Sequence, residues 1–201
     1  MTPEQMERLK KQFQFLLEID QEKYVGRQTY LHDASRKEND AEHAWHLAMF
    51  VLVMSEYANE EIDVLHTVSM VLVHDLIEIY AGDTYAYDEA GKKSQHEREE
   101  NAADRLYSLL PEDQEKKFRA LFEEFEAWET PEAKFAHMCD NIQPAMLNHA
   151  SDGKSWEEHG VHLHQILGRN ERTSEGSEAL WDWSRSNFIL PQVEEGQIKP
   201  D

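Results

Sequence analysis

The sequence contains one cysteine among 201 residues, few glycines and prolines, and no long apolar run. The single Cys139 excludes an internal disulfide and is typical of a reducing compartment. No hydrophobic stretch approaches the length that crosses a membrane, and the polar, charged segment from Met1 to Lys11 does not resemble a signal peptide. We therefore expect a cytoplasmic protein that does not enter a membrane.

Basic residues are also scarce, because 20 Lys and Arg stand against 41 Asp and Glu and give a net charge of −21. Such a surface repels the backbone of nucleic acids and anionic membranes, so binding to either is not expected. A small anionic substrate would be repelled as well, unless a metal ion and arginines make one site locally positive. The chain is long enough to bury the core of one domain.

Apolar residues recur at helical spacing along most of the chain, and we find no strand alternation, repeat or linker. The sequence predicts an all-α protein with a single domain over residues 1–190 and a flexible tail over 191–201. Capping signals mark helix starts at Thr2-Pro3, at Asn39 and at Thr130-Pro131. The expected helices span 3–20, 39–54, 60–80, 94–110, 112–128, 130–146, 156–167 and 177–190, with an aperiodic segment at 21–38 and a loop at 84–93.

The predicted helix over 60–80 combines an apolar pattern with side chains that bind metals. On one helix Glu78 would lie one turn beyond His74 and Asp75, so that the three share a face. Gly82 then ends the helix and Asp83 follows at the turn. Burying these charges without partners would cost several kcal/mol each, and a bound cation removes that cost. A His–Asp hydrogen bond in a core explains the dipeptide equally well, but not the two further carboxylates.

Two more candidate ligands lie on other apolar helices, His43 on the second and Asp140 on the sixth. Together with His74 and Asp75 they would give two imidazoles and two carboxylates, which suit one divalent ion with open positions for water and substrate. Because thiolates are missing from this set, it favours Mn, Co, Fe, Ni or Zn over a structural zinc site.

Three motifs occur in one order: Arg36-Lys-Glu38-Asn39-Asp-Ala-Glu42-His43, then His74-Asp75-x-x-Glu78-x-x-x-Gly82-Asp83, then Asp140-Asn141. In this the chain resembles the HD-domain metal-dependent phosphohydrolases, and within them the branch that contains bacterial 5′-deoxynucleotidases. The resemblance covers about residues 27–140. It implies an HD-type helical bundle whose metal ligands are His43, His74, Asp75 and Asp140.

The resemblance also implies roles for residues around the metal. Glu78 would position or activate the attacking water, and Asp83 would support substrate or water nearby. An arginine upstream of the first ligand binds phosphate in this family. Arg27 is its match here, and Arg36 is a second arginine able to fork to phosphoryl oxygens. Relatives with two irons draw further histidines from between these ligands, so we expect a single metal.

The activity implied is hydrolysis of a small phosphomonoester, a ribo- or deoxyribonucleoside 5′-monophosphate. One alternative is a non-catalytic HD module that senses a nucleotide or a metal, and intact Glu78 and Asp83 favour the enzyme over it. Another is a phosphodiesterase acting on another nucleotide, although the chain lacks the Gly-Tyr-Pro signature of one such branch.

The last predicted helix carries more apolar surface than one helical face normally buries. Its large apolar side chains are Leu180, Trp181, Trp183, Phe188, Ile189 and Leu190. An exposed apolar patch on so acidic a protein is expected to be covered by a partner, and relatives of the branch tend to be dimers. We therefore expect a homodimer through this helix.

Overall fold

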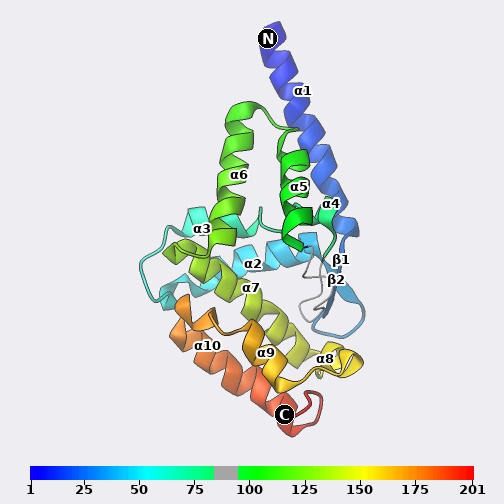
Figure 1. Ribbon diagram of the computed structural model, residues 1–201, viewed down its shortest axis with the longest axis vertical. Coiled ribbons are helices and arrows are strands. Elements are labelled where there is room, and N and C mark those ends of the chain that lie inside the picture. The colour runs from blue at the N-terminus through cyan, green and yellow to red at the C-terminus, as the bar shows by residue number, and fades with distance from the viewer. Residues whose placement is uncertain (84–94) are drawn as a thin grey trace.

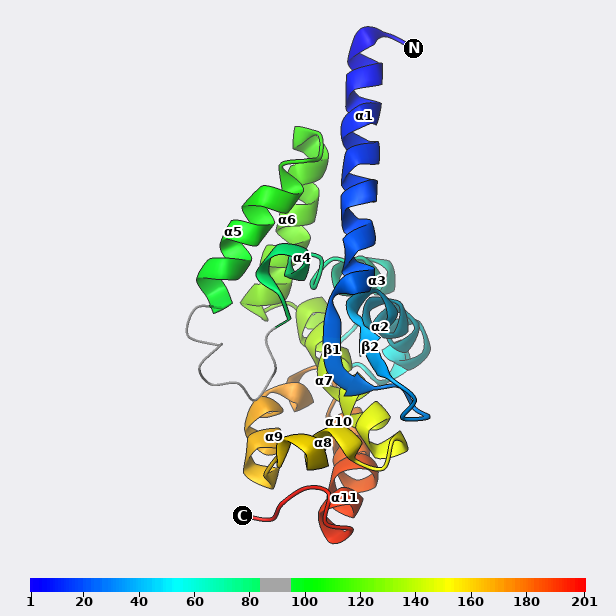
Figure 2. The same cartoon turned by 90° about the vertical axis from the view of Figure 1, so that its right-hand side faces the viewer.

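The longest helix, α7 (Pro131–Ala150), passes through the middle of the computed structural model, which describes residues 1–83 and 95–201 (Figures 1 and 2). α1 (Pro3–Glu18) extends away from one end of the body, and the C-terminal helices form the other end. The other elements are β1 Gly26–Tyr30, β2 Lys37–Asn39, α2 Asp40–Met54, α3 Val64–Val71, α4 Glu78–Ala81, α5 Gln95–Tyr107, α6 Glu112–Ala127, α8 Lys154–His159, α9 Leu163–Arg169, α10 Glu178–Ser184 and α11 Leu190–Glu194. The prediction of an all-α domain is confirmed, apart from one small sheet.

The core consists of two clusters that α7 joins. The larger one packs α2, α3, α5 and α6 against the first half of α7, where Phe135 and Met138 have no exposed surface. The smaller one lies at the C-terminal end of the protein, where Ile166, Ile189 and Ile198 belong to one cluster with Ala145 of α7. Polar residues on the inward face of α7 therefore lie between the two clusters.

The predicted helix starts at Thr2, Asn39 and Thr130 are confirmed. Thr2 and Gln5 form a reciprocal capping box, in which each side chain accepts a hydrogen bond from the other residue's backbone nitrogen. Asn39 and Glu42 do the same at the start of α2. These caps satisfy N–H groups that the first turn of a helix leaves without partners.

The segment 21–38, which has no period in sequence, contains a β-hairpin. β1 pairs antiparallel with β2, with Gly26 opposite Asn39 and Tyr30 opposite Lys37. The strands were not predicted because they are short and polar, without alternation of apolar residues. Their pairing brings β1 to the start of α2, where the backbone nitrogen of Asp40 donates to Val25 at 3.2 Å.

The continuous helix predicted over 60–80 is wrong. α3 begins after Asp63, whose side chain caps it, and residues 72–77 form tight turns before α4. The cause is a competing side chain, because the ring of His74 donates from Nδ1 to the carbonyl of Val71 at 2.9 Å. In a continuous α-helix that carbonyl would accept from the backbone nitrogen of Asp75. The His-Asp pair therefore lies in a break between helices.

The C-terminal segment also differs from expectation. The helix predicted to end at Pro191 continues through a π-helical turn into α11, where proline occupies the first turn and needs no hydrogen bond. Residues 191–201, for which the sequence predicts a flexible tail, pack against the bundle. Ile198 has no exposed surface, and Lys199 exchanges backbone hydrogen bonds with Val161 and Leu163 at 2.9 and 3.0 Å.

The loop predicted over 84–93 lies outside the described residues. Within the described ranges, no helix combines the length and the apolar character required to cross a bilayer.

Candidate metal centre

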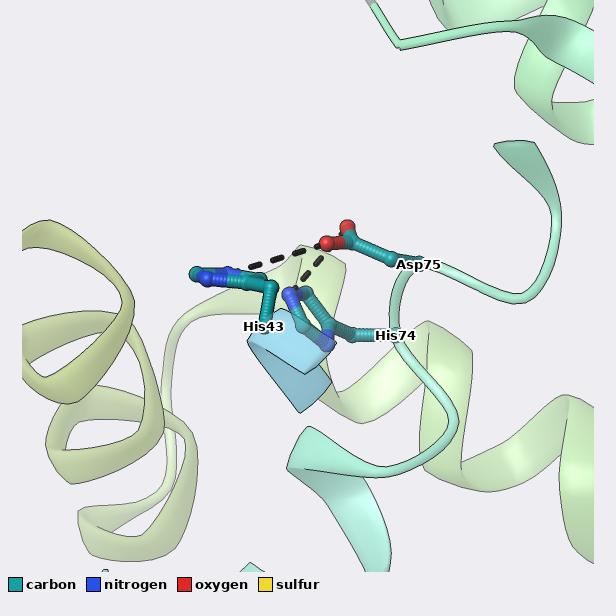
Figure 3. Close-up of side chains that lie close together, drawn as sticks. All are labelled: His43, His74 and Asp75. Atoms are coloured by element: carbon teal, nitrogen blue, oxygen red, sulfur yellow. Dashed lines mark ion pairs between the residues drawn. The ribbon is translucent and has the colours of Figure 1, made fainter. Parts of the chain in front are cut away.

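Three separate elements bring the four predicted ligands together. His43 comes from α2, His74 and Asp75 from the turns between α3 and α4, and Asp140 from α7. Both imidazoles point toward the carboxylate of Asp75 (Figure 3). His74 Nε2 lies 3.1 Å from Asp75 Oδ1, and His43 Nε2 lies 3.0 Å from Asp140 Oδ1 and 3.8 Å from Asp75 Oδ2. The convergence inferred from sequence is thus present, although not on a single helical face.

Hydrogen bonds fix the orientation of both imidazoles. His43 Nδ1 donates to Gln143 Oε1 at 3.0 Å, and His74 Nδ1 donates to the Val71 carbonyl. With Nδ1 of each ring used as a donor, Nε2 is the ring atom that faces the carboxylates and is available to bind a metal ion. Such bonds on the outer nitrogen are typical of histidines that bind metals, because they fix the tautomer and the angle of the ring.

The chemistry of this donor set fits a divalent transition metal. His74 Nε2 is buried and has no hydrogen-bond partner, although acidic oxygens surround it. Metal bonds of about 2.0–2.2 Å place neighbouring ligand atoms about 3 Å apart, and the nitrogen–oxygen pairs found here lie 3.0–3.9 Å apart. His43 and His74 are almost fully buried, whereas Asp75 and Asp140 keep a small exposed edge. The four residues can therefore hold an ion that is reached from one side.

The electrostatics of the site favour a positive charge among these atoms. Burial opposes protonation of His74, but the negative charges of Asp75 and Asp140, whose Oδ1 atoms lie 3.1 and 3.9 Å from Nε2, outweigh it and raise the pKa of His74 to about 10. Burial acts against ionisation of Asp75 and Asp140 too, yet the neighbouring histidines hold both carboxyl pKa values below their usual range. Without a metal ion, a proton on His74 supplies the positive charge that these carboxylates favour, and a bound cation would supply it instead.

Three of the four predicted ligands, His74, Asp75 and Asp140, line a cavity of about 270 Å³. Glu78 and Asp83 both line it, so the two predicted catalytic carboxylates share a space with the ligands. Glu78 is the first residue of α4, and its Oε2 is buried without a partner among the described residues. Burial first, and then repulsion from Asp75 and Asp40, hold the pKa of Glu78 well above its usual value. A carboxylate with a raised pKa is a stronger base toward water.

The structure separates the two arginines that the sequence grouped. Arg27 lines the cavity and donates from Nη1 to Asp75 Oδ2 at 2.9 Å. Arg36 lies outside the set of lining residues and forms a two-fold ion pair with Glu42 on the surface, at 2.8 and 2.5 Å. The expectation that Arg36 reaches a phosphate therefore disagrees with its position, because its guanidinium already pairs with the carboxylate that follows it in the first turn of α2.

Several residues of the site were not predicted from the sequence. Asp40 is fully buried beside Arg27, and Arg169 of α9 lines the cavity with Nη2 3.4 Å from Asp140 Oδ2. Gln143 is also buried. Its Nε2 donates to Glu38 Oε2 at 3.1 Å, and its Oε1 accepts from His43 Nδ1. Gln143 was findable, because it lies three residues after Asp140 and therefore on the same face of the helix. Nothing in the sequence marks Arg169.

A stack of rings connects the centre with the rim of the cavity. The ring of Phe125 lies 4.7 Å from that of His74, and His137 stacks between Phe125 and Trp128 at 3.8 and 3.7 Å. Arg172 covers the outer face of Trp128 at 4.5 Å. Trp128 holds a left-handed conformation with φ of 53°, which is unusual for a bulky residue and gives the cavity an aromatic wall.

The sequence pattern described as HD domain matches residues 19–181 of the chain. The chain belongs to the HD domain family. The match spans all four predicted ligands and most of both core clusters, so the predicted family is confirmed.

Individual relatives agree with this assignment. The chain is 33% identical to the 5′-deoxynucleotidase HDDC2 of Bos taurus over 146 residues, which are 72% of this chain and 68% of that one. Its identity to the 5′-deoxynucleotidase HDDC2 of Homo sapiens is 32% over 145 residues, or 72% and 69% of the two chains. The crystal structure of a predicted metal-dependent phosphohydrolase from Magnetospirillum magnetotacticum MS-1 superimposes on all of both chains with a TM-score of 0.93 and 41% identity.

The stacked His137 gives a testable dependence of stability on pH. Burial lowers its pKa from 6.5 to about 4, so the folded protein keeps this ring neutral. As pH falls below 6.5 the unfolded chain binds a proton that the folded chain refuses, and stability is lost between the two values. Between pH 7.5 and 5, wild type should lose about 2 kcal/mol more free energy of unfolding than His137→Gln.

Urea unfolding at both pH values measures this difference. His32→Gln, at an exposed histidine, serves as the control and should keep the wild-type dependence. Equal losses in wild type and His137→Gln would contradict the neutral state assigned to the ring.

Proposed function

We propose that the protein is a metal-dependent phosphohydrolase that removes phosphate from a nucleoside 5′-monophosphate, with ribose or deoxyribose. The observation that carries the proposal is that His74 and Asp75, which belong to the His-Asp cluster, line one cavity together with Glu78. Relatives named 5′-deoxynucleotidases support the nucleotide as substrate. A module that only senses a nucleotide has no need of a carboxylate placed to accept a proton from water.

The ligands in this proposal are His43, His74, Asp75 and Asp140, and they hold one divalent ion chosen from Mn, Co, Fe, Ni and Zn. Such an ion supplies a bound water of lowered pKa and screens a phosphoryl oxygen. The support comes from the two fixed imidazole tautomers and from the buried, unpartnered Nε2 of His74.

The residues around the metal site have separate roles in this proposal. Glu78 accepts a proton from the attacking water, and Asp83 orients water or substrate at the cavity wall. Arg27 contacts the phosphate, since its Nη1 is used by carboxylates while its Nη2 forms no hydrogen bond within the described part of the chain. Arg169, which lines the same cavity with Nη2 3.4 Å from Asp140 Oδ2, is a second cation for phosphoryl oxygens in place of Arg36.

A panel of ribo- and deoxyribonucleoside 5′-monophosphates, assayed for phosphate release with Mn²⁺, Co²⁺ and Mg²⁺, tests the function. Wild type should release phosphate from at least one substrate class, and Asp75→Ala should lose both metal content and activity, because the change removes a charged ligand. Phosphate release from none of the substrates would contradict the proposal. Stoichiometric metal in Asp75→Ala, measured by elemental analysis, would contradict the ligand assignment.

Glu78→Gln separates the chemical step from metal binding. The amide keeps the shape of the side chain but cannot accept a proton, so turnover should fall by about 10²-fold or more with metal content and fold unchanged. Steady-state kinetics with elemental analysis of the same sample measure both. Turnover within a few-fold of wild type would remove Glu78 from the role of base.

We also propose a cytoplasmic homodimer, but through a different face from the last helix. Of the residues predicted for that contact, Ile189 has no exposed surface, and Leu180, Trp181 and Phe188 pack against the two core clusters. Trp183 is 55% exposed. The fold therefore uses most of the apolar surface that suggested a partner.

A larger exposed apolar surface lies on two helices that pack together, α2 and α3. We call it the α2–α3 face, and its members are Trp45, Met49, Leu52, Val53, Leu65 and Leu72, exposed by 41–75%. No Asp, Glu, Lys or Arg occurs from Ala44 to Ser55 or from Val64 to His74. In a chain of charge −21, an uncharged face is where a second copy can approach with least repulsion.

Substitution of this face should yield monomers. Wild type should sediment at twice the chain mass of 23.6 kDa, and the double variant Leu52→Glu/Leu65→Glu at the chain mass itself. Trp183→Glu, on the helix favoured by the sequence, is the matched control and should remain dimeric. Screening of repulsion should tighten the wild-type dimer slightly at high salt. A wild-type monomer at both salt concentrations, or a dimer disrupted only by Trp183→Glu, contradicts this assignment.

A further inference from the structure

A second group of acidic side chains adjoins the histidine ligands. One oxygen each of Asp40, Asp75 and Glu78 lies within 4.8 Å of the others, and Asp75 belongs to both groups. Asp40 is fully buried and Glu78 is 9% exposed. Asp40 Oδ2 and Glu78 Oε2 are both buried without a hydrogen-bond partner among the described residues. Three carboxylates this close repel one another unless a positive charge lies among them.

Arg27 supplies that charge. Its Nη1 lies 2.9 Å from Asp75 Oδ2 and 3.2 Å from Asp40 Oδ1, and its side chain is only 12% exposed. Asp75 therefore lies between two positive positions: Oδ2 is nearer to the guanidinium, at 2.9 Å, than to His43 Nε2, at 3.8 Å, and Oδ1 lies 3.1 Å from His74 Nε2. This is the arrangement of a carboxylate that bridges two metal ions, which in two-metal enzymes lie about 3.5–4 Å apart.

We propose that the guanidinium of Arg27 occupies the place of a second divalent cation, and that Asp40, Asp75 and Glu78 form a latent metal site that opens when this group is removed. The donors are all carboxylate oxygens, which suit hard cations such as Mn²⁺ and Mg²⁺. The inference rests on the proposed function only in taking the histidine cluster as the first metal site.

An ordinary explanation is that Arg27 merely neutralises a buried acidic cluster. The two explanations predict different outcomes when the guanidinium is lost. A cluster that needs only neutralisation takes up protons when the guanidinium is removed, and binds no additional metal. A latent site instead binds a second ion, because the three carboxylates already lie within 4.8 Å of one another and lose the charge that compensated them.

The experiment counts Mn²⁺ per chain by elemental analysis after equilibrium dialysis, without substrate. Wild type should bind one equivalent and Arg27→Gln two, whereas Arg27→Lys, which keeps the charge, should bind one. The double variant Arg27→Gln/Asp40→Asn should return to one, because it lacks a ligand of the latent site. Arg36→Gln, at an arginine paired on the surface, is the matched control and should bind one.

Electron paramagnetic resonance gives an independent reading. Two Mn²⁺ ions joined by the carboxylate of Asp75 should be exchange-coupled in Arg27→Gln, so the six-line signal of an isolated ion is lost. The isolated-ion signal should persist in wild type and in the double variant.

One equivalent in folded Arg27→Gln, or two in wild type, overturns the proposal. If Arg27→Gln folds only with Mn²⁺, the count is made on protein refolded with the ion. A chain that stays unfolded at saturating Mn²⁺ also overturns it, since a cation at the latent site replaces the missing charge. Failure of the proposed function would appear separately, as absent phosphate release with these stoichiometries unchanged.

Discussion

Buried acidic side chains around one cavity impose the main constraint on this fold. Burial raises the pKa of Asp40 to about 6 and that of Glu22 to about 7, and the charge of Asp75 adds to both shifts. So much negative charge cannot remain inside a helical core without cations, and Arg27 is the buried arginine that meets it. The hairpin that carries Arg27, although small, is therefore as necessary to the site as the helices.

α7 supplies further partners for the buried polar groups around the cavity. Asp140 and Gln143 lie on its inward face, and Pro144 follows within the helix. Proline has no N–H, so the carbonyl of Asp140 lacks its usual backbone partner four residues on. The amide of Gln143 meanwhile accepts from His43 and donates to both Glu38 and His46, which makes its orientation unambiguous.

The features that could be predicted from the sequence are those that depend on residues close together in the chain. The capping residues at Thr2 and Asn39 marked their helices because a cap acts within one turn, and His74-Asp75 stood out because such residues are rare in apolar surroundings. The break before α4 was missed because it depends on one side chain displacing one backbone hydrogen bond. Arg169 was missed because its partner lies 29 residues away and only the tertiary fold joins them.

The ring stack also limits the movement of one predicted metal ligand, His74. His74 donates to the Val71 carbonyl and packs against the tilted ring of Phe125, and His137 and Trp128 continue the packing. Rotation of the imidazole would disturb every ring in the series, so its conformational entropy is lost during folding and not at binding. Preorganisation of this kind favours tight capture. An ion that enters would therefore meet a His74 ring that is already held in one orientation.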